Sequence, residues 1–144
     1  MIQRMQSLFF LLAAGCFGGE FATSFASSDI ANEGIFSDQL YNLSDHPGLQ
    51  IITGIGLLIS IAAIFLYRNR TLQVKLGYVL ATIAILLPVV AVLIFMNHTG
   101  QAENLQIEDQ LGLYLPLGMI VFSLLAVRYV KKDEKLVQSM DRLR

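Results

Sequence analysis

The stretch that decides the fold is LQIITGIGLLISIAAIFLY, residues 49–67, which contains no Asp, Glu, Lys or Arg. A helix of this length spans about 28 Å, close to the thickness of the hydrocarbon layer of a membrane. Three more apolar stretches accompany it, at residues 7–25, 72–96 and 111–130. The chain is 55% hydrophobic and 15% charged, whereas soluble domains are about a quarter charged. The sequence therefore predicts an all-α integral membrane protein, a single four-helix bundle within residues 1–144.

All ten Lys and Arg residues fall on one side of the membrane that these spans define. They are Arg4, Arg68, Arg70, Lys75, Arg128, Lys131, Lys132, Lys135, Arg142 and Arg144. The connections 26–48 and 97–110 contain acidic residues but no Lys or Arg. Because loops rich in Lys and Arg stay in the cytoplasm, we expect both termini there. Residues 26–48 and 97–110 are then expected on the opposite, outer side of the membrane.

Residues 1–26 allow three interpretations. Arg4, an apolar run and the small residues around Phe25 resemble a signal peptide with its cleavage site. Residues 13–16, Ala-Ala-Gly-Cys, resemble a weak lipobox in which Cys16 would carry a lipid. We favour the third interpretation, a retained transmembrane helix. Because Cys16 is the only cysteine, an intramolecular disulfide is excluded.

The first span contains two features that could carry function. Gly15 and Gly19 form a G-x-x-x-G pair, which lets helices approach closely in lipid, so we expect a helix–helix contact here, internal or with a partner. Glu20 is the one acid inside a span, about 7 Å from its outer end by helical rise. It could be an ion or proton site, or an acid near the membrane surface that reaches water or caps a neighbour. We favour the second, since no basic residue lies at its depth.

The outer connections and Pro88 give further expectations. Pro88 lies near the middle of the third span and predicts a kink. Residues 26–48 are too apolar for a plain linker and predict a short helix or hairpin packed on the helix ends. Residues 44–48, Ser-Asp-His-Pro-Gly, predict a helix start with Asp or His as cap and Pro first. His46 and His98 lack a fixed metal-binding spacing. We expect no metal, no cofactor and no nucleic-acid partner.

The tail, residues 131–144, combines basic residues with apolar ones at helical spacing. It predicts a helix that continues the fourth span and lies against the membrane surface, where anionic lipid or a cytoplasmic protein could bind. The candidate interaction residues of the whole chain are Gly15, Gly19, Glu20, Arg68, Arg70, Lys131, Lys132, Lys135, Leu136, Met140, Arg142 and Arg144.

Several segments resemble a known family of four-helix membrane proteins of Bacteroidota. They are MIQR at 1–4 with QSLF at 6–9, YRNRTLQ at 67–73, LYLPL at 113–117, KKDEKLV at 131–137 and DRLR at 141–144. The family is the domain-of-unknown-function family numbered 4293, and the resemblance covers the whole chain. The chain departs from it in the outer connections and in the first helix, where Gly15, Gly18, Gly19 and Glu20 replace an aliphatic run. The resemblance implies four helices in the bacterial inner membrane, with residues 26–48 and 97–110 in the periplasm, and no established activity.

The sequence contains no nucleophile–base pair, metal motif or nucleotide-binding loop, so we do not expect an enzyme. We expect a non-enzymatic accessory subunit or scaffold of a larger membrane complex. Its partners would be the lipid bilayer, other membrane subunits or further copies of the chain, and anionic lipid at the basic tail. The alternative is a small oligomeric transporter or channel that uses Glu20 and the Pro88 kink.

Overall fold

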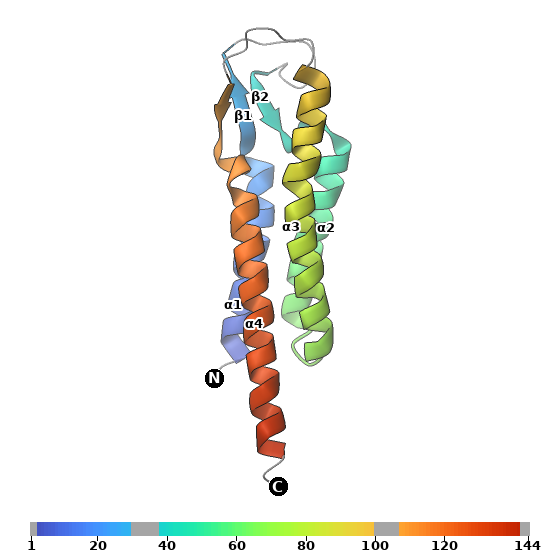
Figure 1. Ribbon diagram of the computed structural model, residues 1–144, viewed down its shortest axis with the longest axis vertical. Coiled ribbons are helices and arrows are strands. Elements are labelled where there is room, and N and C mark those ends of the chain that lie inside the picture. Colours follow the sequence, from blue (N-terminus) through green and yellow to red (C-terminus); the bar gives the residue numbers. More distant parts are fainter. Residues whose placement is uncertain (1–2, 30–37, 100–106, 142–144) are drawn as a thin grey trace.

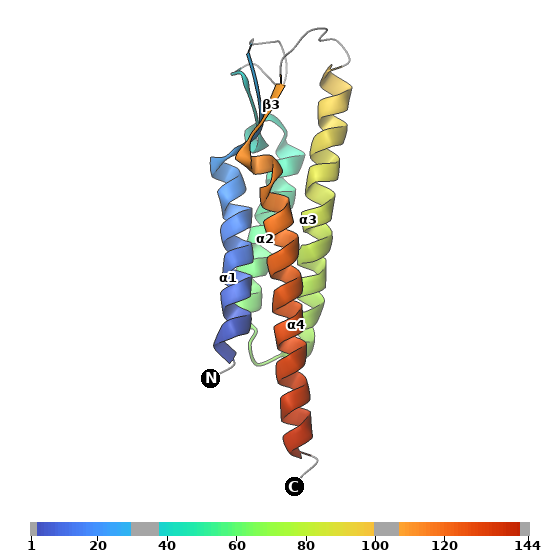
Figure 2. The same ribbon diagram turned by 60° about the vertical axis from the view of Figure 1, so that its left-hand side comes forward.

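The computed structural model describes residues 3–29, 38–99 and 107–141. Within them, four long helices form an elongated up-and-down bundle (Figures 1 and 2). They are α1 (Gln3–Gly19), α2 (Pro47–Phe65), α3 (Arg70–Thr99) and α4 (Leu115–Asp141). All four are long and apolar enough to cross a membrane, so the predicted fold class is confirmed. α1 packs against α2 and α4, and α3 packs against the same two helices.

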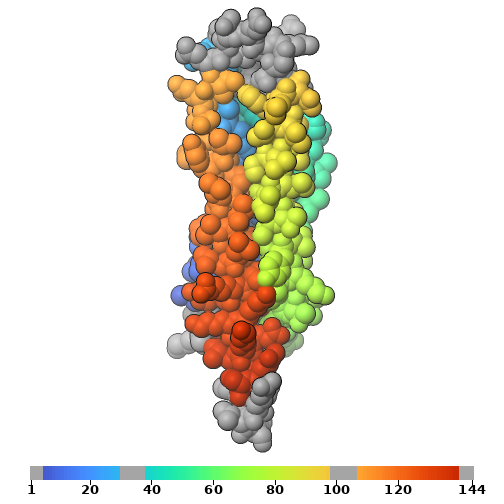
Figure 3. All heavy atoms as spheres, in the orientation of Figure 1, coloured from blue at the N-terminus to red at the C-terminus, as the bar shows by residue number. Residues whose placement is uncertain are grey.

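Two helix ends differ from the predicted spans. α1 stops at Gly19 and passes through a 3-10 turn, η1 (Glu20–Ala22), into a strand that starts at Ser24. The predicted helix end at residue 25 is therefore wrong, because Phe25 belongs to a strand and packs in the protein core instead of facing lipid. α4 continues without a break past residue 130 to Asp141 and projects beyond the other three helices (Figures 1 and 3).

A small antiparallel sheet closes the end of the bundle opposite the termini, which we call the sheet end (Figures 1 and 2). β1 (Ser24–Ser28) lies between β2 (Leu40–Asn42) and β3 (Ile107–Asp109). A short helix, η2 (Leu43–Asp45), follows β2, and another, η3 (Leu111–Leu113), follows β3. The expectation of a hairpin or short helix in the first outer connection is confirmed. The sequence did not predict that the second outer connection would supply a strand to the same sheet.

The start of α2 follows the predicted pattern. Pro47 is the first helical residue, and His46 is the cap whose Nδ1 accepts a hydrogen bond from the Gly48 N–H at 3.1 Å. Asp45 serves the preceding turn, where its carboxylate accepts a hydrogen bond from the Asn42 N–H at 2.6 Å. The predicted His-Pro helix start is therefore confirmed.

The interior contains two clusters of buried apolar side chains. The main core lies between the four helices and consists of Phe10, Phe17, Ala63, Leu80, Ala84, Met119, Ala126 and Val130. The second, at the sheet end, consists of Phe25, Ala26, Tyr41, Leu43, Leu49, Leu87 and Ala91. Many large apolar side chains also face outward, including Leu58, Phe65, Leu93 and Leu117, each more than half exposed. Such a surface is suited to lipid, where outward apolar groups have no water to avoid.

Candidate functional site

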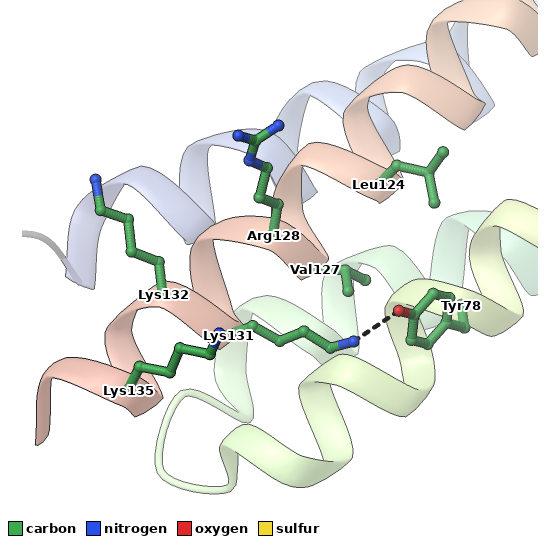
Figure 4. A pocket seen from close by; sticks show the side chains of 7 residues that line it. All are labelled: Tyr78, Leu124, Val127, Arg128, Lys131, Lys132 and Lys135. Carbon is green, nitrogen blue, oxygen red and sulfur yellow. Dashed lines mark hydrogen bonds between the residues drawn. The ribbon is translucent and has the colours of Figure 1, made fainter. Parts of the chain in front are cut away.

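A groove lined by basic side chains lies between α3 and α4, near the end of the bundle that carries both termini (Figure 4). Its volume is about 500 Å³. The lining residues are Tyr78 from α3 and Leu124, Val127, Arg128, Lys131, Lys132 and Lys135 from α4. We call this feature the basic groove. None of these lining residues is acidic, so no lining side chain neutralises the four positive charges that α4 brings to the groove.

The helical repeat of α4 explains why the basic residues gather. Arg128, Lys131, Lys132 and Lys135 recur at i, i+3, i+4 and i+7, which places them on one face of a helix. The same face continues toward the sheet end with exposed apolar residues at the matching spacing, Leu117, Val121 and Leu124. One exposed stripe of α4 is therefore apolar along the span and basic at its end.

Lys131 crosses the groove to reach α3. Its Nζ donates a hydrogen bond to the Tyr78 hydroxyl at 2.7 Å and lies 5.0 Å from the centre of the Tyr78 ring. The contact thus holds one positive charge at the mouth of the groove (Figure 4).

Tyr78 is a site residue that the sequence analysis missed. The neighbouring Gly77 lets α3 approach α4 closely, because a Cβ at Gly77 would overlap the Val127 side chain. An aromatic residue about two turns inside the basic end of a span is typical of the membrane–water boundary. The sequence signal that could have identified Tyr78 was therefore an aromatic residue at this depth in the span, directly after a glycine.

The turn between α2 and α3 meets the same end of α4. Arg68, Arg70 and Val137 line a second hollow of about 470 Å³. The Arg70 Nη1 donates a hydrogen bond to the backbone carbonyl of Asp133 at 3.4 Å. The prediction that this turn and the basic tail lie at the same end of the bundle is confirmed.

The tail residues have different surroundings. Leu136 and Val137 are 43% and 38% exposed on the part of α4 that projects beyond the bundle. Met140 lies within α4, but its side chain, and Arg142 and Arg144 altogether, are outside the described residues. The described tail continues straight along α4 (Figure 1), so the expected turn onto the membrane surface is not seen before Asp141.

The two glycines of the G-x-x-x-G pair do not form one contact face. A Cβ at Gly19 would lie 3.4 Å from the Leu115 side chain of α4, so Gly19 serves the packing of α1 against α4. A Cβ at Gly15 would have no neighbour within 4 Å. Gly19 therefore makes an internal helix contact, whereas Gly15 faces outward, where the expected contact with a partner stays a prediction.

Glu20 does not reach water in this structure. Its side chain is completely buried, and neither carboxyl oxygen has a hydrogen-bond partner. The interpretation of Glu20 as an acid that reaches water or caps a neighbour is therefore wrong. The burial of Glu20 depends on the contacts between the 3-10 turn η1 and the rest of the sheet end. These contacts join distant parts of the chain, so they could not be predicted from the sequence around Glu20.

Only one of the two histidine side chains lies within the described residues. His46 uses its Nδ1 to cap α2, and the side chain of His98 lies outside the described residues. Among the described residues, no group of three or more His, Cys, Asp or Glu side chains is arranged to hold a metal ion. Cys16 is partly buried and faces Gly118 of α4.

The prolines of α3 and α4 meet at the sheet end. Pro88 and Pro116 both line an apolar cavity of about 300 Å³, together with Tyr41 and Asp109. α3 continues through Pro88 to Thr99, and Pro116 occupies the first turn of α4, where no helical hydrogen bond is lost. Glu20 is not among the described residues that line this cavity.

Comparison with known proteins gives one match. No curated protein and no solved structure is similar to this chain at a significant level. Residues 2–143 match the family described as "Domain of unknown function (DUF4293)". This match spans nearly the whole chain, so the protein, with its four membrane-spanning helices and its basic groove, belongs to the DUF4293 family.

Proposed function

We propose that this chain is a non-enzymatic protein of the bacterial cytoplasmic membrane that binds anionic phospholipid in the basic groove and serves as an accessory subunit or scaffold of a larger membrane complex. The observation that carries the proposal is the exposed stripe of α4, which is apolar from Leu117 to Leu124 and basic from Arg128 to Lys135. The basic end of the bundle then lies in the cytoplasm, as the distribution of Lys and Arg favours.

The stripe matches the two chemical parts of a phospholipid. An acyl chain can lie along Leu117, Val121 and Leu124, while the headgroup phosphate meets Arg128 and Lys131. Basic pockets between transmembrane helices on the cytoplasmic side are suited to anionic headgroups, and each nearby Lys or Arg contributes roughly 1 kcal/mol. The absence of acidic residues among those lining the groove favours an anionic ligand over a zwitterionic one.

Native mass spectrometry of the purified protein tests lipid binding. Phosphatidylglycerol should remain bound, whereas phosphatidylcholine should not. Replacing Lys131 and Lys135 together by Gln should abolish the phosphatidylglycerol adduct. A matched variant that also loses two charges, Arg68→Gln with Lys75→Gln, should retain it, because neither residue lines the groove. Equal losses in both variants would mean that only diffuse charge attracts lipid.

The projecting end of α4 supports the accessory-subunit role. Leu136 and Val137 expose apolar surface beyond the other helices, and a partner that covers them would remove this surface from water. A chain truncated after Lys135 keeps the basic groove and loses these two residues. We expect it to retain bound lipid and to lose any protein that the full chain brings through purification at fixed stoichiometry. A companion that remains at full stoichiometry on the truncated chain would contradict this role of the tail.

A transporter or channel is the second candidate, and the burial of Glu20 favours it. Reconstitution into proteoliposomes tests it by measuring proton or sodium flux. A flux that is present in the unmodified protein and lost in Glu20→Gln would favour this candidate over the accessory subunit. The apolar cavity at Pro88 supports it less, because Glu20 does not line that cavity.

A further inference from the structure

Two polar side chains at the sheet end of the bundle are completely buried and have no hydrogen-bond partner. One is Glu20, at the start of η1, with both carboxyl oxygens unpaired. The other is Thr53, in the second turn of α2, whose hydroxyl is unpaired. Buried polar groups in proteins are nearly always paired, so two unpaired ones call for an explanation.

The packing of α1 on α2 brings these two residues to the same depth. The Phe17 ring lies over Gly56, where a Cβ would overlap it, and this fixes the register of the two antiparallel helices. One turn closer to the sheet end, the chain has advanced from Phe17 in α1 to Glu20. Because α2 runs in the opposite direction, the same step along α2 leads from Gly56 back to Thr53. Residues three apart share a helix face. Glu20 and Thr53 therefore occupy the same contact face at the same level.

No positive charge lies nearby to balance an ionised Glu20. α2 contains no ionisable side chain between Pro47 and Phe65, and α4 contains none before Arg128. The ionisable groups on the other neighbouring segments are Cys16, one turn earlier on α1, Asp45 in η2, which contacts η1, and His46, which follows η2. Cys16 and Asp45 are acidic groups, and His46 uses its Nδ1 as a hydrogen-bond acceptor to cap α2. An isolated carboxylate in such surroundings is far more costly than the neutral acid.

We propose that Glu20 is a proton-binding site at the sheet end of the bundle, and that the Thr53 hydroxyl at the same level pairs with its carboxyl group once the two side chains rotate toward each other. In the closed bundle, the carboxyl group carries the proton and remains neutral. Release transfers the proton from the carboxyl oxygen to a water molecule and leaves a carboxylate that must be hydrated, so η1 must separate from the neighbouring segments, η2 among them, that keep water from Glu20. Proton occupancy at Glu20 therefore controls the packing of the sheet end. This inference is independent of the lipid and of the partner proposed above.

Labelling with the hydrophobic reagent dicyclohexylcarbodiimide tests the proton site. The reagent adds to protonated carboxyl groups and remains attached as an N-acylurea. In the full chain reconstituted in phosphatidylcholine vesicles, we expect peptide mass spectrometry to find the label on Glu20, with a rate that falls as the pH is raised. Glu20→Gln should remain unlabelled at that position. Absence of label on Glu20 at every pH would overturn the proposal, and so would protection by sodium at constant pH, which would indicate a sodium site.

Infrared spectroscopy tests the role of Thr53. The band of a protonated carboxyl group should be present in the unmodified protein and absent in Glu20→Gln. It should move to higher frequency in Thr53→Val, because the carboxyl group loses a hydrogen bond. Ser60→Ala is the matched control, since Ser60 is also buried in α2 but donates its hydrogen bond to the Gly56 carbonyl. A band that does not change in Thr53→Val would overturn the pairing, provided that circular dichroism shows an intact helical fold.

Discussion

Tyr41 ties the small sheet to the bundle through one buried hydroxyl group. It donates a hydrogen bond to the Ala91 carbonyl of α3 at 3.0 Å, and its ring packs near those of Phe25 and Phe95. Burial, reinforced by the negative charge of Asp45, raises the pKa of Tyr41 from 10.0 to about 12. The hydroxyl therefore stays neutral and able to donate well into the alkaline range.

Replacing Tyr41 by Phe should destabilise the protein by about 1 kcal/mol, the net contribution of a typical hydrogen bond. Because the folded-state pKa lies above the unfolded-state value, the contribution of Tyr41 is complete below about pH 10 and is lost as the pH rises toward about 12. Thermal unfolding in detergent, followed by circular dichroism, should show a difference between the two proteins that shrinks over this interval. A difference that is constant from pH 8 to pH 12 would contradict the assigned role.

Gly56 of α2 leaves room for the Phe17 ring of α1, because a Cβ at this position would overlap the ring. Gly56→Ala should cost roughly 1–3 kcal/mol, because the added carbon overlaps the Phe17 ring. Gly15→Ala is the matched control on the other helix of the pair, where the added carbon meets nothing within 4 Å. It should be neutral or stabilise by up to about 1 kcal/mol, as Ala favours helix over Gly. Equal melting temperatures for the two variants would contradict the register in which Phe17 of α1 packs on Gly56 of α2.

At the level of elements, the helices could be predicted because their signals are local. Residues 49–67 form a stretch that is long and apolar enough to require a membrane span. The pair His46-Pro47 indicates the helix start from local sequence alone. The basic stripe of α4 could likewise be read from its spacing. Its partner Tyr78 could not, because the contact depends on the close approach of α3 at Gly77.

The sheet and the end of α1 depend on contacts between distant parts of the chain. β3 contains only Ile107–Asp109, which is too short for an alternating pattern, and it pairs with β1 about eighty residues earlier. Residues up to Phe25 have the composition of a continuous apolar helix, and only the hydrogen bonds supplied by β2 and β3 make the last of them a strand. The burial of Glu20 follows from that change, since it places the acid in a turn under the sheet.

A designed disulfide tests the pairing of β1 with β3. Ser27 and Glu108 are directly opposite each other across the two antiparallel strands. Opposed residues have Cβ atoms about 4.5–5.5 Å apart, within reach of a disulfide after small adjustments. In a Cys16→Ala background, Ser27→Cys with Glu108→Cys should cross-link, as judged by a mobility shift that dithiothreitol reverses. Ser27→Cys with Ile107→Cys is the control, because a shift of one residue turns the side chain to the opposite face. Equal cross-linking of both pairs would contradict the register.

The whole molecule separates its charges along its long axis. The basic groove and the arginines of the α2–α3 turn lie at one end, and the acidic sheet with Glu108 and Asp109 lies at the other. The apolar surface between them fits the hydrocarbon layer. This arrangement favours one orientation of the bundle in a cell membrane, with the basic groove and Glu20 near opposite faces.

Cysteine labelling tests this orientation directly. In a Cys16→Ala background, single cysteines replace exposed residues at the two ends: Ser44 near the sheet, and Thr71 or Ser139 at the basic end. Because basic segments are retained in the cytoplasm, a membrane-impermeant maleimide should label position 44 in intact spheroplasts. Positions 71 and 139 should react only after lysis. Ser37 and Gln106 would be alternative outer positions, but they lie outside the described residues. Labelling of position 71 in intact spheroplasts would place the basic groove outside the cell, away from the cytoplasmic leaflet and from any cytoplasmic partner of α4.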